Sequence, residues 1–256
     1  MKEEAGNGHN SDLMIFGLRP VMEAIEEGKD IERVFIQRDL RSPLIFQLKT
    51  LLKEAGIHPV TVPIEKLNRL TRKNHQGVVC YLSSITYFKL SDVVPGLFEQ
   101  GVDPVLLLLD RITDVRNFGA ICRTAECTGV HAVVVPEKGG APANGDAVKS
   151  SAGALHRISV CREYNLKDAI DYLKDSGFRI VGCSEKGADY TYDFDFNGPV
   201  CIIMGSEENG ISSEYLKKCD NILRIPMEGK TASLNVSVAA GMILYELIRQ
   251  RSISEK

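Results

Sequence analysis

The stretch "PVLLLLDRITDVRNFGAICRTAECTGVHAVVVP", residues 104–136, places two apolar runs on either side of a helical pattern. We predict strands over residues 104–110 and 131–136, because continuous apolar runs of this length are typical of parallel strands that are covered on both faces. Between them, apolar residues recur from Phe118 at the spacing of one helical face, which predicts a helix over residues 117–128. A strand, a helix and a strand in this order indicate an α/β fold.

The same alternation continues towards the C-terminus. The further predicted strands are 157–161, 178–184, 199–205 and 221–226, and the further predicted helices are 145–155, 166–176 and 233–250. We therefore expect residues 104–256 to form one α/β domain with helices on both faces of its sheet. Ligands of such domains usually bind beyond the carboxyl ends of the strands, so the loops after the strands are the candidate site.

A smaller α/β domain is predicted for residues 13–88. Its predicted elements are helices at about 18–27 and 64–70, a helix and then a strand within "PLIFQLKTLLKEAGIHPVTVP", and strands at about 32–37 and "GVVCYL". The segment from Leu90 to Pro104, "LSDVVPGLFEQGVDP", combines two prolines and two glycines with weak periodicity, and we predict a linker over residues 89–103. Residues 1–12 are polar and acidic, and we expect a disordered tail.

The composition is that of a soluble globular protein, with 44% apolar and 25% charged residues among 256. No secretory signal is visible at the start, and no apolar run reaches the ~20 residues of a membrane span. The seven cysteines show no Cys-x-x-Cys pair and no zinc spacing, and most lie inside apolar runs, where cysteine acts as a small apolar residue. We predict a cytoplasmic protein that binds neither membrane nor metal.

The net charge of −3 is unevenly distributed along the chain. Residues 13–88 carry 11 Lys and Arg against 8 Asp and Glu, whereas residues 89–256 carry 19 against 23. A modestly basic domain favours nucleic acid as a partner. Within "NRLTRKNHQG" a plausible phosphate-contacting edge consists of Arg69, Arg72, Lys73 and His75. A solvated surface loop is the alternative, and the sequence does not decide between them.

The loop and helix after residue 110 offer two polar candidates. Arg123 lies on the side of the predicted helix away from the apolar stripe, so it is either solvated or directed into a cleft. Asn117 lies at the start of the helix, where asparagine most often caps.

The loop in "IIMGSEENGIS", residues 202–212, imitates the glycine spacing of a phosphate-binding loop. Ile211 stands where such a loop needs lysine, and Glu207 and Glu208 would repel phosphates, so we exclude nucleoside triphosphate binding. Gly205 and Gly210 still allow a ligand to approach the backbone closely.

A polar turn opens "RIPMEGKTASLNVSVAAG", residues 224–241. Either Thr231 or Ser233 is predicted to cap the helix that follows. That helix is apolar on nearly all sides, so it is either buried in a core or pressed against a partner subunit. Capping explains one hydroxyl but hardly both Ser233 and Asn235.

Taken together, "NFGAICRTAECTGV", "IIMGSEENGIS" and "RIPMEGKTASLNVSVAAG" resemble the three motifs of the SpoU (TrmH) family of RNA ribose 2'-O-methyltransferases, within the SPOUT class. In the first domain, "IFGLRPVMEAI" and "KNHQGVV" resemble the small ribosomal-protein L30e-like RNA-binding domain of the subgroup that contains the bacterial 23S rRNA guanosine 2'-O-methyltransferase. The three motifs occur in family order and are specific only as a set.

The resemblance implies an α/β sheet with a deep trefoil knot, S-adenosylmethionine as cofactor, and a homodimer whose active site draws on both subunits. By the same likeness, the cofactor-binding residues are Gly205, Ile225 and Leu234, with Met204, Leu223 and Met227 as neighbours. The catalytic and RNA-contacting residues implied by the family are Asn117, Arg123, Glu207, Ser233 and Asn235. The implied reaction is methylation of a ribose 2'-hydroxyl, with a guanosine of 23S rRNA as the first candidate.

Three alternatives accompany this reading. A tRNA could be the substrate instead of rRNA. A non-catalytic RNA-binding assembly factor could share the fold, although the complete set of polar motif residues argues against it. A dinucleotide-dependent enzyme is disfavoured, because no Gly-x-Gly-x-x-Gly follows the first strand of either domain.

Overall fold

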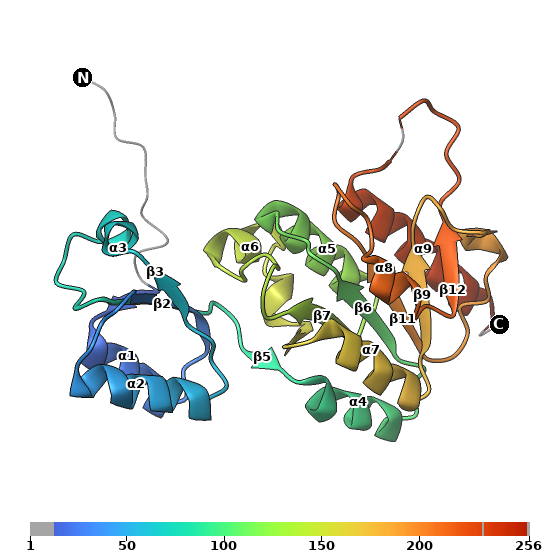
Figure 1. Cartoon of the computed structure of the whole chain (residues 1–256). Helices are drawn as coiled ribbons and strands as arrows, with labels where there is room; N and C mark the ends of the chain where they lie inside the picture. The colour runs from blue at the N-terminus through green and yellow to red at the C-terminus, as the bar shows by residue number, and fades with distance from the viewer. Residues whose placement is uncertain (1–12, 232, 255–256) are drawn as a thin grey trace. The chain divides into compact units, whose positions relative to one another are not determined.

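The structure is a computed structural model that describes residues 13–231 and 233–254. The tail predicted for residues 1–12 lies outside this range. The described chain divides into two compact units (Figure 1). The first unit contains residues 13–86 together with 143–145, and the second contains the rest.

The first unit is built on a four-stranded mixed sheet in the order β1-β4-β2-β3. Its strands are β1 (Met14–Phe16), β2 (Ile31–Gln37), β3 (Val60–Val62) and β4 (Val78–Leu82). Its helices are α1 (Leu18–Glu26), α2 (Pro43–Glu54) and α3 (Ile64–Leu70). Side chains of α1 and α2 pack on one face of the sheet, around Val34 and Cys80. On the other face Leu67 of α3 packs against Phe35 and Val79. The predicted elements of this unit are confirmed, and β1 is added.

The second unit contains an eight-stranded sheet in the order β10-β12-β9-β11-β6-β7-β8-β5. Every pairing described for it is parallel. The strands are β5 (Tyr87–Phe88), β6 (Val105–Leu109), β7 (Ala132–Pro136), β8 (Ser159–Glu163), β9 (Arg179–Cys183), β10 (Asp189–Tyr190), β11 (Val200–Met204) and β12 (Asn221–Arg224). The predicted parallel α/β arrangement is confirmed.

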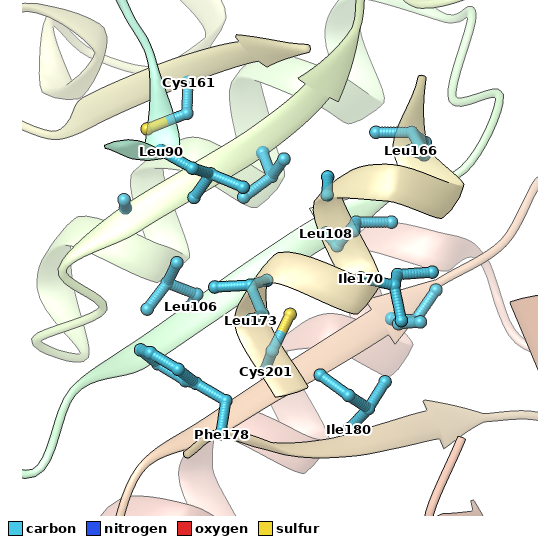
Figure 2. Close-up of a cluster of buried hydrophobic side chains, with 14 of the residues drawn as sticks. Leu90, Leu106, Leu108, Cys161, Leu166, Ile170, Leu173, Phe178, Ile180 and Cys201 are labelled. Carbon is cyan, nitrogen blue, oxygen red and sulfur yellow. The ribbon is translucent and has the colours of Figure 1, made fainter. Parts of the chain in front are cut away.

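Helices cover both faces of this sheet, and all five residues of β6 are therefore buried. The helices are α4 (Leu90–Glu99), α5 (Val115–Cys127), α6 (Gly145–Ser150), α7 (Leu166–Asp175), α8 (Ser213–Leu216) and α9 (Val236–Ser254). Figure 2 shows one face, where Leu106 and Leu108 of β6 meet Leu173 of α7 and Leu90 of α4. On the other side of the sheet lies α5 (Figure 1), which packs against α9 near Gly241 and Thr124.

The linker predicted for residues 89–103 is wrong, because α4 occupies most of it. Leu90, Val94 and Leu97 are buried in the core of the second unit. The backbone N–H of Leu90 also donates to Glu163 at the end of β8, at 2.8 Å. Pro95 costs the helix one internal hydrogen bond. The burial of Leu90, Val94 and Leu97 outweighs that loss.

The strand order creates a switch point between β6 and β11. From β6 the chain runs outwards through β7 and β8, then returns to build β9, β11 and β12 on the other side of β6. Consequently the loops after β6 and β11 leave the sheet side by side at its carboxyl edge. A crevice at such a point is the usual ligand site of a parallel α/β sheet.

Candidate active site

The loops after β6 and β11 are tied together by one buried carboxylate. Asp110, which is 1% exposed, accepts hydrogen bonds from the backbone N–H and the hydroxyl of Ser212, both at 2.7 Å. Arg111 pairs with the same carboxylate, with Nε 2.9 Å from Oδ1, and donates to the Gly210 carbonyl at 3.1 Å. The carboxylate also raises the pKa of Arg111 through its hydrogen bond. These bonds fix the position of residues 205–212.

The loop after β11 is a tight turn that depends on its first glycine. Ser206 and Gly210 exchange two backbone hydrogen bonds, of 3.1 and 2.8 Å. A Cβ atom on Gly205 would lie 2.1 Å from the Gly210 carbonyl carbon, so no other residue fits without moving the turn. The turn leaves Glu207 and Glu208 exposed at its tip.

Three of the predicted polar residues meet at this tip. The side-chain amide of Asn117 donates to Oε1 of Glu207 at 2.8 Å, and the amide of Asn235 donates to the same oxygen at 2.8 Å. The Asn235 amide also lies 3.1 Å from Oδ1 of Asn117. We call Asn117, Glu207 and Asn235 the polar triad. Both donors converge on one carboxylate oxygen, so the triad fixes the orientation of Glu207.

The capping roles differ from those predicted. Asp114 caps α5, because its Oδ1 accepts from the backbone N–H of Asn117 at 2.8 Å, and the Asn117 side chain is therefore available for the triad. At α9 neither Thr231 nor Ser233 caps. Instead, Oδ1 of Asn235 accepts from the backbone N–H of Ser237 at 2.9 Å. The cap orients Asn235, so that its amide faces Glu207.

A pocket of about 500 Å³ opens beside the triad, at the carboxyl ends of β9, β11 and β12. Five of the six predicted cofactor-binding residues line it: Met204, Gly205, Ile225, Met227 and Leu234. Ser233 lines it as well. Leu223 does not, because its side chain is fully buried within β12. The volume and the mixture of apolar and polar walls are typical of a site for a small organic ligand.

A second pocket of about 280 Å³ lies on the other side of Glu207. Its wall includes Arg111, Thr113, Asp114 and Asn117. The two pockets share Ser206, Glu207, Glu208, Asn209 and Val236. The Glu207 carboxylate therefore borders both the larger and the smaller pocket, where it can reach reacting groups held in either.

Sequence reasoning missed Cys183 as a lining residue of the larger pocket. Burial, with a smaller contribution from the Glu185 carboxylate, raises the pKa of this thiol to about 12. The thiol is therefore protonated at neutral pH and a poor nucleophile towards an electrophilic ligand. Cys183 ends the predicted strand 178–184, and the ends of such strands often line a ligand site. The apolar sequence of that strand does not show whether its last residue lines a pocket or belongs to the core.

Arg123 is not brought to the polar triad. It is exposed on α5 and lines neither pocket. Within the first unit, Arg69, Arg72 and Lys73 are exposed. Nζ of Lys73 lies 5.7 Å from the centre of the Phe16 ring.

The phosphate contact predicted for His75 does not fit the structure. The residue is 8% exposed, its Nε2 lies 2.9 Å from Oδ1 of Asn68, and its Nδ1 accepts from the backbone N–H of Gly77 at 3.0 Å. Both ring nitrogens are thus used inside the domain, where they order the loop around Gly77.

The apolar helix α9 is buried on one side only. Val236, Ile243 and Leu247 are buried, whereas Val238, Met242 and Tyr245 are 50%, 43% and 67% exposed. The structure therefore leaves an apolar face on α9 that no described part of the chain covers.

No helix in the described part of the chain combines the length and the apolar character needed to cross a membrane. Nor do three or more His, Cys, Asp or Glu side chains come together in a group that could hold a metal ion.

The sequence matches two family models. The model for the SpoU rRNA Methylase family covers residues 104–245, which include the polar triad. The model for the RNA 2'-O ribose methyltransferase substrate-binding domain covers residues 14–88.

Curated proteins and solved structures give the same result. YacO of Bacillus subtilis, whose name places it among TrmH family tRNA/rRNA methyltransferases, is 32% identical over 93% of this chain and 96% of its own length. An uncharacterized tRNA/rRNA methyltransferase of Synechocystis sp. is 36% identical over 93% of this chain, which spans 62% of that protein. The crystal structure of the SpoU methyltransferase AviRb from Streptomyces viridochromogenes, in complex with AdoMet, is 28% identical with a TM-score of 0.60. It covers 94% of this chain and 90% of its own.

The matching models cover both units, and the catalytic-domain model alone spans more than half of the chain. This protein is a member of the SpoU methylase family.

Proposed function

We propose that this protein transfers a methyl group from S-adenosylmethionine to a ribose 2'-hydroxyl of RNA. The observation that carries the proposal is the position of Glu207. Two side-chain amides orient its carboxylate between the two pockets. A reaction between a small donor and a sugar hydroxyl needs such an oriented acceptor at the place where the two meet.

The larger pocket fits the proposed cofactor. Met204, Ile225 and Leu234 offer apolar surface for an adenine ring, and Gly205 allows close approach to backbone groups. Leu223 supports this wall from within the sheet. S-adenosylmethionine would supply a methyl group activated by a positively charged sulfur. The protonated thiol of Cys183 does not compete for that methyl group.

The polar triad prepares the acceptor hydroxyl. Oε1 of Glu207 is held by Asn117 and Asn235, so we assign the contact with substrate to Oε2. In our proposal Oε2 accepts the hydrogen bond of the ribose hydroxyl and takes its proton as the oxygen becomes methylated. Ser233, in the wall of the larger pocket, contacts the same substrate.

Arg123 is proposed to hold the phosphate beside the target ribose and to stabilise negative charge on the 2'-oxygen. A guanidinium does not act as a base, because it is not deprotonated in proteins. Since Arg123 does not reach the pockets of its own chain, we propose that it serves the active site of a second subunit.

A homodimer through the second unit follows from this assignment. The exposed apolar side chains of Val238, Met242 and Tyr245 on α9 offer a surface for it. The deep trefoil knot expected of the family, the L30e-like character of the first unit and a cytoplasmic location belong to the same proposal.

The favoured substrate is a guanosine of 23S rRNA, because the first unit resembles that of the enzymes acting there. A tRNA remains the second candidate, since the relatives' names include both RNA classes. A non-catalytic RNA-binding factor is the weakest reading, because such a protein would not need the oriented Glu207.

Mapping ribose 2'-O-methylation across total RNA, in cells with and without the gene, tests this function. We expect one methylated ribose to be lost on deletion, at a position in 23S rRNA. A lost position in tRNA would select the second candidate, and an unchanged map would refute the proposal.

A further inference from the structure

The first unit contains a groove of about 570 Å³ that lies apart from the basic stretch predicted to contact RNA. It is formed by the end of β2, the loop of residues 38–42 and the first turns of α2. Ile36 and Ile45, which are 2% and 1% exposed, form part of its floor.

The rim of this groove is positively charged. Arg38, Arg41 and Lys49 line it and are exposed, against Asp39 as the single carboxylate. Within the described residues, none of these three cations forms an ion pair, whereas Lys29 of the same unit is paired with Glu27. Unpaired cations around a groove attract phosphates.

An aromatic ring stands at the same place. Phe46 lines the groove and is 70% exposed, the largest exposed fraction among the large apolar side chains described. Lys49 follows it by three positions on α2, so the two side chains lie on the same face of the helix. A flat ring surrounded by cations is the combination with which proteins bind unpaired nucleotides, by stacking on the base and pairing with the backbone. An apolar protein partner would be poorly matched by three charges around one ring.

The groove is held in shape by the loop that contains His75. The backbone N–H of Gln37 donates to the Gly77 carbonyl at 2.8 Å, and the N–H of Arg38 donates to the Val62 carbonyl at 2.8 Å. Gly77 has a positive φ of 80°, which favours glycine, and a Cβ atom there would also press against Cδ2 of Leu40, at 2.7 Å. The segment "NHQG" thus supports the groove from behind instead of contacting RNA itself, and the groove is preorganised.

We propose that this groove binds an unpaired nucleotide of the RNA substrate, whose base stacks on Phe46 while the adjoining phosphates contact Arg38, Arg41 and Lys49. The inference rests on the proposed function for the identity of the substrate as RNA. It moves the principal RNA contact of the first unit from residues 69–75 to residues 38–49.

The test measures the binding of the full-length protein to two short fluorescein-labelled RNAs by fluorescence anisotropy. One is a hairpin with an unpaired loop, and the other is a fully paired duplex. We expect Phe46→Ala to weaken hairpin binding by about tenfold and duplex binding little, since stacking requires an unpaired base. Phe46→Tyr should retain wild-type affinity, because it keeps the ring.

Salt dependence tests the phosphate contacts. Lys49→Gln and Arg41→Gln should each reduce the slope of log affinity against log salt by about 0.7, the value for one lost contact to a single strand. Lys53→Gln is the matched control, because Lys53 lies one turn further along α2 and outside the groove. Equal effects of Lys49→Gln and Lys53→Gln would overturn the phosphate assignment.

The proposal is refuted if Phe46→Ala binds the hairpin as tightly as the wild type, or if polyglutamate displaces the hairpin as well as unlabelled RNA does. Methyl transfer by the wild-type protein is measured separately. If Phe46→Ala weakens hairpin binding but the wild-type protein transfers no methyl group, the groove is upheld and the proposed enzyme activity is rejected. If the wild-type protein transfers methyl groups but Phe46→Ala binds the hairpin normally, the enzyme activity is upheld and the groove is rejected.

Discussion

The side-chain amide of Asn235 lies 2.8 Å from Oε1 of Glu207, while Oδ1 of Asn235 accepts from the backbone of Ser237 and caps α9. A single residue therefore starts the C-terminal helix and orients the carboxylate of the loop after β11. Its two polar atoms have separate tasks, and substitutions can separate them.

The first prediction concerns these two tasks. Asn235→Asp keeps the capping oxygen but replaces the amide donor by a carboxylate oxygen beside Oε1 of Glu207. We expect the cap to persist and kcat to fall by about a hundredfold or more, because a positioned donor is lost and two like charges are brought together. Asn235→Ala should lose activity similarly and also about 1 kcal/mol of stability with the cap. Thermal unfolding and single-turnover methyl transfer measure both quantities. A fully active Asn235→Asp protein would show that the amide does not orient Glu207.

The second prediction concerns Asp110. Asp110→Ala leaves two Ser212 donors without their acceptor and releases Arg111, so we expect a loss of about 2–3 kcal/mol in the free energy of unfolding. Ser212→Ala removes only the hydroxyl bond and should cost about 1 kcal/mol. Urea unfolding measures both. Equal costs would indicate that the carboxylate does not tie the two loops together.

The third prediction concerns pH. Burial raises the pKa of Cys80 and of Cys161 to about 12, from an ordinary value of 9.0. Above pH 9 these thiols ionise in the unfolded chain but remain protonated in the folded one. Their stabilisation is therefore complete below pH 9 and is lost as the pH rises towards 12.

Urea unfolding at pH 8 and pH 10 tests this sign. Between pH 8 and pH 10, ionisation of one thiol in the unfolded chain lowers the free energy of unfolding by about 1.4 kcal/mol. We therefore expect the free energy of unfolding of Cys80→Ala to fall by about 1.4 kcal/mol less than that of the wild type. Cys127→Ala is the control for the removal of an exposed thiol instead of a buried one. An identical pH dependence for all three proteins would contradict the assignment.

The fourth prediction concerns α9. Replacing Met242 and Tyr245 by aspartate should convert a dimer into a monomer, because two charges would enter an apolar interface. Sedimentation velocity reports the mass. Tyr164→Asp is the matched control, since Tyr164 is 63% exposed and lies outside α9. A wild-type protein that sediments as a monomer would contradict the proposed homodimer.

The fifth prediction tests whether Arg123 acts on the partner subunit. Arg123→Ala and Glu207→Gln should each abolish turnover, and Arg123→Ala should leave S-adenosylmethionine affinity within a few-fold. When the two variants are mixed and allowed to exchange subunits, each heterodimer regains one site with both native side chains. Recovered activity is expected. No recovery in a mixture shown to contain heterodimers would mean that Arg123 does not act across subunits.

Apolar runs predicted the six longer strands of the parallel sheet, because a strand covered on both faces admits few polar residues. The two-residue strands β5 and β10 were not predicted, because they are too short to show such a run. The helix α4 was not predicted, because Pro95 and Gly96 are unfavourable inside a helix. Burial of Leu90, Val94 and Leu97 against the sheet outweighs this local preference. Capping was misassigned for a similar reason. Asp114 and Asn235 compete with neighbouring polar residues for the same role, and the geometry of the whole loop decides between them.

For the candidate site, the family motifs predicted a set of polar residues but not where the fold places each one. The expected convergence is seen for Asn117, Glu207 and Asn235. In contrast, Leu223 is fully buried, and the His75 ring forms hydrogen bonds inside its own domain. The groove at Phe46 was invisible in the sequence, because its cations are spread over residues 38–49 and become neighbours only when β2 turns into α2.

Methyl transfer itself can be followed by incubating the purified protein with methyl-labelled S-adenosylmethionine and RNA from cells that lack the gene, and then analysing the nucleosides. We expect label in a 2'-O-methylated ribose, and none with the Glu207→Gln protein. Label in a base, or equal transfer by the wild-type and Glu207→Gln proteins, would refute the proposed role of Glu207 in ribose methylation.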